Sequence, residues 1–186
     1  KLVDNNYVGR ESFYKLYNIY INKKNKFKTS IASIEYQGDS GFSNTDLNIA
    51  QQLNDINNST IKHIIGVNGD SDDESQLDMQ MMGINMLSSK TELWFWDEKN
   101  WLYSLAVNMS NTNKIPDIIS MSWGWAEDQQ CTVANCKNET SYQYINRVNI
   151  EYIKLGLRGV TITVASGDAG APGRTSEGCE IGRAHV

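Results

Sequence analysis

The segment YINRVNIEYIKLGLRGVTITVAS, residues 144–166, contains both kinds of element from which the fold is predicted. Its first part belongs to the longest predicted helix, residues 139–157. Gly159 ends that helix, because glycine readily adopts the left-handed conformation that follows a helix. The apolar run over residues 160–166 then predicts a short strand. A helix that leads directly into an apolar strand is one half of the βαβ unit of a parallel sheet.

An alternation of strands and helices runs upstream of this segment. The spacing of Phe13, Leu16 and Tyr20 places them on one helical face and predicts a helix over residues 11–20. Alternation of this kind predicts an α/β fold with a parallel sheet that has helices on both faces. Further strands are expected at residues 30–36, 61–67, 93–96 and 117–123. Further helices are expected from 43 or 44 to 56, from 73 to 87 and from 97 or 100 to 109. A basic loop is expected at 23–28 and an acidic loop at 70–73.

The composition argues against several classes of function. The 186 residues include 17 basic and 22 acidic side chains, a formal net charge of −5, and no basic stripe, so no nucleic-acid partner is expected. No apolar run approaches the roughly 20 residues of a membrane span, so no membrane partner is expected. Three cysteines are poorly spaced for zinc, and no metal site is expected within the chain. Of the two histidines, His63 lies within a predicted strand and is a poor candidate for a catalytic base, and His185 lies near the end of the sequence.

Two acidic side chains form the most informative chemical pattern. Glu74 and Asp78 are four residues apart on the predicted helix 73–87. That spacing puts both carboxylates on one helix face, where their repulsion raises the pKa of one of them. A glutamate with a raised pKa can act as a general base in mildly acidic conditions. The alternative is a solvated acidic turn that favours the positive end of the helix dipole, and Asp72 and Asp73 fit that interpretation.

The loop after the last predicted strand is a second candidate for function. Ligands bind at the carboxyl ends of the strands in parallel α/β sheets, and Ser166, Gly167 and Asp168 stand at such an end. The glycine lets the backbone turn sharply and approach a ligand. The alternative is an ordinary tight turn, in which aspartate is a common residue.

The strand that ends in Ser122-Trp123-Gly124 is a third candidate. A strand end of this kind can offer backbone groups to an extended peptide and an aromatic wall beside it. The alternative is an ordinary buried tryptophan at the end of a strand.

In combination, these motifs resemble the sedolisin family, the serine-carboxyl peptidases, and within it the tripeptidyl-peptidase I group. Their order is a Glu-x-x-x-Asp helix, a strand that ends in Ser-Trp-Gly and a strand that ends in Ser-Gly-Asp-x-Gly. The resemblance extends from about residue 12 to residue 180. Further stretches that agree with the family are SFYKLYNIY at 12–20, SNTDL at 43–47, GDSDDESQLDMQ at 69–80 and the helix, strand and loop of 144–174.

The resemblance implies a subtilisin-like fold in which a glutamate replaces the histidine of a serine-protease triad. Glu74 would then be the general base, Asp78 the group that orients it, and Asp168 the acid of the oxyanion hole. A carboxyl group can stabilise an oxyanion only when it is protonated, so the resemblance implies catalysis at acidic pH. The substrate-binding residues that it implies are Ser122, Trp123, Gly124, Ser166 and Gly167.

The resemblance also implies features outside this sequence. The family's nucleophilic serine belongs to a Gly-Thr-Ser segment, which does not occur here. Residues 1–180 are therefore expected to be the N-terminal part of a truncated catalytic domain that is inactive alone, and IGRAHV at 181–186 a non-native tail. The complete protein is expected to have a calcium site, a propeptide in its precursor and peptide or protein substrates, with no cofactor in this part of it.

The expected function is that of a serine-carboxyl peptidase, either a tripeptidyl-peptidase or an endopeptidase. The alternative is a catalytically inactive subtilisin-like domain that binds peptides. A Gly-Thr-Ser segment in the complete sequence would favour the enzyme, and its absence would favour the binding domain.

The cysteines and glycosylation motifs fit a lysosomal or secreted protein. Cys131 and Cys136 could close a small disulfide loop or remain free thiols, and Cys179 has no evident partner in the sequence. Asn-x-Ser/Thr matches, which belong on surface loops when they are glycosylated, begin at Asn57, Asn58, Asn108 and Asn138.

Overall fold

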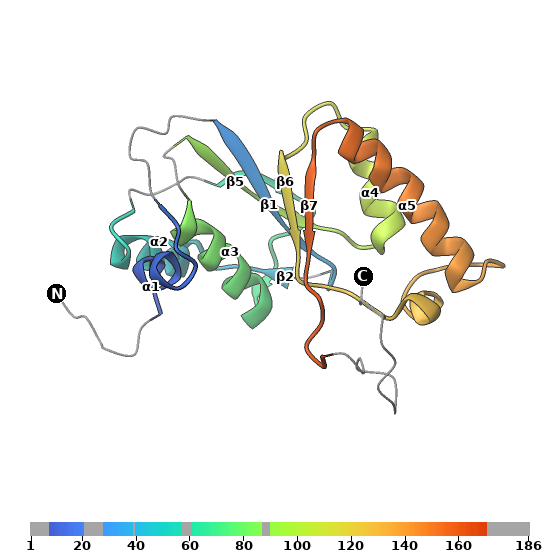
Figure 1. The fold of residues 1–186 in the computed structure, drawn as a ribbon, viewed down its shortest axis with the longest axis horizontal. Helices are drawn as coiled ribbons and strands as arrows, with labels where there is room; N and C mark the ends of the chain where they lie inside the picture. The colour runs from blue at the N-terminus through green and yellow to red at the C-terminus, as the bar shows by residue number, and fades with distance from the viewer. Residues whose placement is uncertain (1–7, 21–27, 39, 57–60, 87–89, 171–186) are drawn as a thin grey trace.

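A five-stranded parallel sheet forms the centre of the computed structural model, which describes residues 8–20, 28–38, 40–56, 61–86 and 90–170. The strand order is β3-β5-β1-β6-β7 (Figure 1). The prediction of an α/β fold with a parallel sheet is confirmed, and the arrangement is consistent with a subtilisin-like fold. The strands are β1 (Thr29–Glu35), β3 (Ile61–Ile65), β5 (Thr91–Asp97), β6 (Ile118–Met121) and β7 (Thr161–Val164).

Helices cover both faces of the sheet because its strands are apolar on both sides. α4 (Leu102–Ser110) and α5 (Ser141–Leu157) lie on one side of the sheet, and α2 (Asn44–Leu53) and α3 (Asp73–Asn85) on the other (Figure 1). Successive residues of a strand point to opposite faces. In β1, Ile34 is therefore buried in the cluster that includes residues of α4 and α5. Its neighbour Glu35 points toward α3, which positions this side chain for the site described below.

The helices on the α2 and α3 side begin at polar caps. The carboxylate of Asp72 accepts a hydrogen bond from the backbone N–H of Ser75 at 2.8 Å and starts α3. The hydroxyl of Ser43 accepts from the backbone N–H of Asp46 at 3.2 Å and starts α2. Such caps satisfy backbone donors that a helix leaves unpaired at its first turn. The start of α3, and with it the position of its acidic side chains, is therefore defined by Asp72.

Several predicted helix boundaries are wrong for local backbone reasons. The helix predicted over 11–20 is α1 (Arg10–Leu16), and it stops before Asn18, whose φ of 51° is left-handed. The helix predicted to reach residue 56 stops at Leu53, before Asp55 with φ of 54°. A residue in the left-handed region ends a helix, and asparagine and aspartate adopt it more readily than most residues.

Other predicted boundaries change because of pairing or capping. The helix predicted from 97 or 100 starts at Leu102, since β5 continues to Asp97, which pairs with Glu35. α5 starts two residues later than predicted, because Thr140 is its N-cap and forms a capping box with Gln143 in the first turn. The strands predicted at 61–67, 117–123 and 160–166 are shorter, as the bounds of β3, β6 and β7 show, and α3 ends at Asn85 rather than residue 87.

Three short elements were not predicted. The acidic loop at 70–73 contains β4 (Asp70–Ser71), which pairs in parallel with β2 (Ser40–Gly41). Pairs of two residues leave no periodic pattern in a sequence, so only the fold reveals them. The short helix η1 (Glu127–Thr132) follows the β6 strand end. Among the described residues, no helix combines the length and the apolar character needed to cross a membrane.

Candidate active site

The carboxyl edge of the sheet gathers side chains from segments that are distant in the sequence. β1, β6 and β7 are neighbours in the sheet, so the chain segments that leave them lie together at this edge. A cavity of about 220 Å³ opens there, which we call the carboxyl pocket; its lining residues are Glu74 and residues 122–126, 165 and 167–169. The structure thus brings the predicted Glu74 and Asp168 to one cavity, together with the predicted strand end at 122–124. Ser166, a further predicted residue, is exposed and does not line this cavity.

Asp78 connects α3 to two strands. Its Oδ2 atom accepts hydrogen bonds from the hydroxyl of Ser122 at 2.7 Å and from the hydroxyl of Ser33 at 3.3 Å. Burial raises the pKa of Asp78, and the two serine hydroxyls counteract part of that rise because they stabilise the ionised form. Asp78 therefore has a defined position relative to β1 and the end of β6, whatever its role in chemistry.

Glu74 lies one helical turn before Asp78 and lines the carboxyl pocket. Its side chain is half-buried. Burial raises its pKa, and the negative charges of Asp78 and Asp168 raise it further. Glu74 thus has the property that a general base needs in mildly acidic surroundings, a pKa above that of an ordinary glutamate.

Glu35 is a member of the same acidic cluster that sequence reasoning missed. It has no exposed surface, its Oε1 accepts a hydrogen bond from the Ser33 hydroxyl at 2.7 Å, and its Oε2 accepts from the indole Nε1 of Trp123 at 2.8 Å. Burial raises its pKa to about 7, with a contribution from the charge of Asp78. The signal that the sequence offers for it is an acidic residue at the carboxyl end of an apolar strand.

Asp72 belongs to the helix start rather than to the reactive cluster. Burial alone would raise its pKa, but hydrogen bonds from the backbone N–H groups of Ser75 and Gly41 outweigh burial and lower the pKa below its ordinary value. A carboxylate held ionised by backbone donors at a helix N-terminus is a cap. The interpretation of Asp72 as part of a stabilising acidic turn is therefore confirmed.

Gly167 gives the β7 loop its sharp turn. Its φ of 85° is in the left-handed region, where a side chain would introduce strain. Asp168, directly after it, is exposed at the mouth of the carboxyl pocket. The turn accounts for how a residue that follows a strand comes to face α3.

His63 lies on the edge strand β3, away from these residues. Its ring packs on Trp94 with centroids 4.0 Å apart, and its Nε2 lies 2.8 Å from the Nζ of Lys114. It does not line the carboxyl pocket. This position agrees with its interpretation as a structural residue rather than a base.

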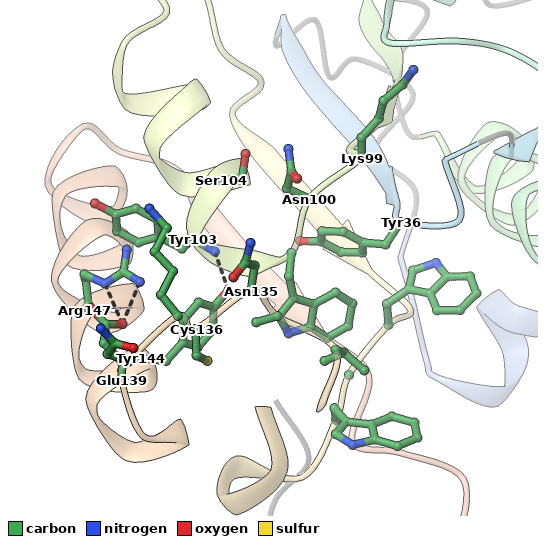
Figure 2. A pocket seen from close by; sticks show the side chains of 18 residues that line it. Tyr36, Lys99, Asn100, Tyr103, Ser104, Asn135, Cys136, Glu139, Tyr144 and Arg147 are labelled. Carbon is green, nitrogen blue, oxygen red and sulfur yellow. Dashed lines mark hydrogen bonds and ion pairs between the residues drawn. The ribbon is translucent and has the colours of Figure 1, made fainter. Parts of the chain in front are cut away.

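A second, larger cavity lies on the other side of the strand end at residues 123–125. It has a volume of about 970 Å³ and is the feature shown in Figure 2. We call it the aromatic pocket, because aromatic rings supply much of its wall. Its aromatic lining residues are Tyr36, Trp101, Tyr103, Trp123, Trp125 and Tyr144, and the other lining residues are Gly124 and residues from 99–104, 133–139 and α5. No sequence motif predicted this cavity.

A disulfide bond closes the loop beside the aromatic pocket. It joins Cys131 to Cys136, so one of the two alternatives left open by the sequence is realised. Cys179 lies outside the described residues. Among the glycosylation motifs, Asn138 is exposed in the turn after this loop, whereas Asn108 lies on α4 and donates a hydrogen bond to Oε2 of Glu98 at 3.0 Å. Asn57 and Asn58 lie outside the described residues.

The described part of the chain contains no group of three or more histidine, cysteine, aspartate or glutamate side chains arranged to hold a metal ion.

Comparison with known proteins finds curated relatives of the chain. No family model matches the chain. The chain is 41% identical over 154 residues to physarolisin from Physarum polycephalum, an alignment that covers 81% of this chain and 26% of physarolisin. It is 38% identical over 63 residues to tripeptidyl-peptidase 1 from Rattus norvegicus, covering 34% of this chain and 9% of that protein, and 36% identical over 63 residues to its counterpart from Mus musculus. The chain thus spans about a quarter of the length of physarolisin.

Proposed function

Because this chain is a relative of the sedolisin family, we propose that it is the part of an acid-acting serine-carboxyl peptidase that supplies the general base and the oxyanion-hole acid. The observation that carries the proposal is the carboxyl pocket. Glu74 lines it from α3, and Asp168 lines it from the loop after β7. Glu74 has a raised pKa there, and Asp78 is held beside it by the hydroxyls of Ser33 and Ser122. Two carboxyl groups at one cavity suit acid and base roles.

The proposed mechanism assigns one proton to each step. Ionised Glu74 takes the proton of a serine hydroxyl as the oxygen attacks the peptide carbonyl, and it returns that proton to the leaving amine. Asp78 orients Glu74 and tunes its proton affinity. Asp168, when protonated, donates a hydrogen bond to the oxyanion. The attacking serine is proposed to belong to a Gly-Thr-Ser segment outside this sequence, so the chain alone would be inactive.

Substrate binding is assigned to the strand end at 122–124. The backbone groups of Trp123 and Gly124 have no hydrogen-bond partner among the residues that the structure describes. An extended peptide can pair with free backbone groups of this kind by adding a strand. The substrates are therefore proposed to be peptides or proteins bound in an extended conformation.

The protein is proposed to act in an acidic, oxidising compartment, either in the lysosome or outside the cell. The Cys131–Cys136 disulfide supports it, because such bonds persist outside the reducing cytosol. The exposed glycosylation motif at Asn138 supports it as well. A calcium site and a propeptide in the complete protein remain part of the proposal on the basis of the family resemblance alone.

The test is peptide hydrolysis by the full-length protein from about pH 3 to about pH 8. We expect cleavage at the acidic end of this range, and we expect Glu74→Gln to lower kcat/KM by about 10²-fold to 10⁴-fold while thermal unfolding stays cooperative. Glu11→Gln is the matched control, because Glu11 also lies in the first turn of a helix but is exposed on α1. Activity that survives Glu74→Gln would refute the assignment of the base. A wild-type protein that binds peptides and cleaves none would favour the inactive binding domain.

A further inference from the structure

The aromatic pocket and the carboxyl pocket are joined by a shared wall. Trp123, Gly124 and Trp125 line both cavities. A peptide that pairs with this strand end would therefore place the residues at its scissile bond in the carboxyl pocket. Residues further along the same peptide would lie at the aromatic pocket. The aromatic pocket is more than four times as large in volume, about 970 Å³ against about 220 Å³, so it has room for at least one large side chain.

The two cavities differ in charge. Among its described lining residues, the carboxyl pocket has two carboxyl groups, Glu74 and Asp168, and no cationic side chain. The aromatic pocket is lined by three cationic side chains and by one acidic one, Glu139. This local excess of positive charge stands out in a chain whose formal net charge is −5.

Two of the three cations are available to a ligand. Arg147 is engaged, since its Nη2 lies 2.7 Å from Oε2 of Glu139 and its guanidinium lies 3.8 Å from the ring centre of Tyr103 (Figure 2). Lys99 and Lys137 are exposed, and neither has an ion pair with any described residue. Unpaired ammonium groups at a cavity rim attract carboxylates over several ångströms.

The pocket is held in shape before any ligand arrives. Gln130 is fully buried, its Oε1 accepts from the indole Nε1 of Trp101 at 2.6 Å, and its Nε2 donates to the backbone carbonyl of Trp125 at 2.7 Å. The adjacent Cys131–Cys136 disulfide restrains the loop that forms the outer wall. A preformed cavity loses little conformational entropy on binding.

We propose that the aromatic pocket binds a substrate residue with a carboxylate side chain, at a position remote from the scissile bond, with Lys99 and Lys137 as the groups that select it. This inference rests on the proposed function and deepens it by naming the substrate class, peptides with an acidic residue two or more positions from the bond that is cleaved. The aromatic rings pack against the methylene groups of that residue, and the exposed ammonium groups at the rim attract its carboxylate through space.

The test measures KM and kcat of the full-length protein with pairs of peptides that differ only by Glu or Gln at one position. That position is moved one residue at a time along the peptide. We expect Glu to lower KM by about threefold to tenfold at one remote position with kcat unchanged, as two exposed ion pairs would. Lys99→Gln with Lys137→Gln should abolish the preference. Lys62→Gln is the matched control, because Lys62 is exposed on β3 and lines neither cavity. The preference should also disappear below about pH 3.5, where the substrate glutamate is protonated.

A binding measurement separates this inference from the proposed function. The same fluorescent peptides are titrated into the Glu74→Gln variant, so that turnover does not matter. If the wild-type full-length protein cleaves none of the peptides, while the Glu74→Gln variant binds them Glu-selectively and loses that selectivity when both lysines are also changed, the peptidase would be refuted and the pocket assignment supported. Cleavage without a Glu preference at any position, or with a preference that the double variant keeps, would overturn the pocket assignment and leave the peptidase intact.

Discussion

The two cavities on either side of residues 123–125 are opposites in almost every physical respect. The carboxyl pocket is small, and its acidic side chains lie near buried carboxyl groups with raised pKa values. The aromatic pocket is large, its rings surround open space, and its free charges are exposed lysines. Trp123 belongs to both, because its ring lines each cavity while its indole N–H reaches Glu35. A single strand end thus separates a region suited to proton transfer from a region suited to recognition.

The difference follows from where each cavity lies in the fold. The carboxyl pocket lies at the ends of neighbouring parallel strands, where side chains from α3 and β1 meet in a low-dielectric interior. Burial there raises the pKa values of Glu35, Glu74 and Asp78. The aromatic pocket lies between α4, α5 and a disulfide-closed loop, and its rim lysines, Lys99 and Lys137, are exposed. Four predictions test this contrast.

The largest expected effect concerns Glu35 and pH. Its pKa rises from 4.5 to about 7 on folding, so the folded protein binds this proton more tightly than the unfolded chain does. The resulting stabilisation is complete below about pH 4.5 and is lost as the pH rises through about 7. Glu35→Gln stays uncharged at every pH. We expect it to match wild type near pH 4 and to exceed it by on the order of 3 kcal/mol in unfolding free energy above pH 7.

Urea unfolding of the full-length protein at a series of pH values measures this difference. Glu127→Gln is the control, because Glu127 is exposed in η1 and should give a profile parallel to wild type. Parallel profiles for Glu35→Gln and wild type would mean that Glu35 is not the buried proton-binding group described here, and the contrast between the two cavities would lose its main support.

The next effect concerns the disulfide beside the aromatic pocket. Replacement of both Cys131 and Cys136 by alanine should lower the unfolding free energy by about 2 kcal/mol, because the bond closes a short loop of sequence separation 5. The pH dependence attributed to Glu35 should remain, since that group lies on the other side of the shared wall. Reduction of the wild-type protein by a thiol should reproduce the loss and leave the double variant unaffected. A variant as stable as wild type would show that the loop needs no restraint.

The third effect compares the two tryptophans of the shared wall. Trp123→Phe removes the donor to Oε2 of Glu35, whereas Trp125→Phe removes an indole N–H that is buried without a partner among the described residues. Both changes remove similar volume. Above pH 7, where Glu35 is ionised, we expect Trp123→Phe to cost about 1.5 kcal/mol more than Trp125→Phe in unfolding free energy. Equal costs in denaturant titrations would show that the Trp123–Glu35 hydrogen bond contributes nothing net.

The smallest effect concerns the start of α3. Asp72→Ala should lower the unfolding free energy by about 1 kcal/mol through loss of the cap on Ser75. Asp73→Ala, one residue later and exposed, should cost only a few tenths of that amount, because Asp73 acts through the helix dipole alone. Thermal unfolding of both variants provides the comparison. An equal cost for the two would show that Asp72 acts only as a charge near the helix end.

Much of the fold could be predicted from local patterns. The strands and the long helices were expected in the order in which they occur, because periodicity is a property of neighbouring residues. Boundaries were less predictable, as the early ends of α1 at Leu16 and α2 at Leu53 show. The strand order β3-β5-β1-β6-β7 does not follow the sequence, and no local pattern contains it.

The candidate site divides in the same way. The spacing of Glu74 and Asp78, the turn at Gly167 and the order of the motifs pointed to the cavity that the structure contains. Glu35 and its bond to Trp123 join residues 88 positions apart, which no motif spacing encodes. The roles assigned to Glu74, Asp78 and Asp168 are predictions.

The sequence by itself determined the order of the longer helices and strands and which acidic side chains share a helical face, because those properties depend on residues a few positions apart. Only the tertiary structure decided that Glu35 joins the acidic cluster and that a basic, aromatic cavity adjoins an acidic one. The physical reason is that burial and charge–charge interaction depend on distance in space. Chain segments far apart in the sequence acquire those distances only when the sheet assembles.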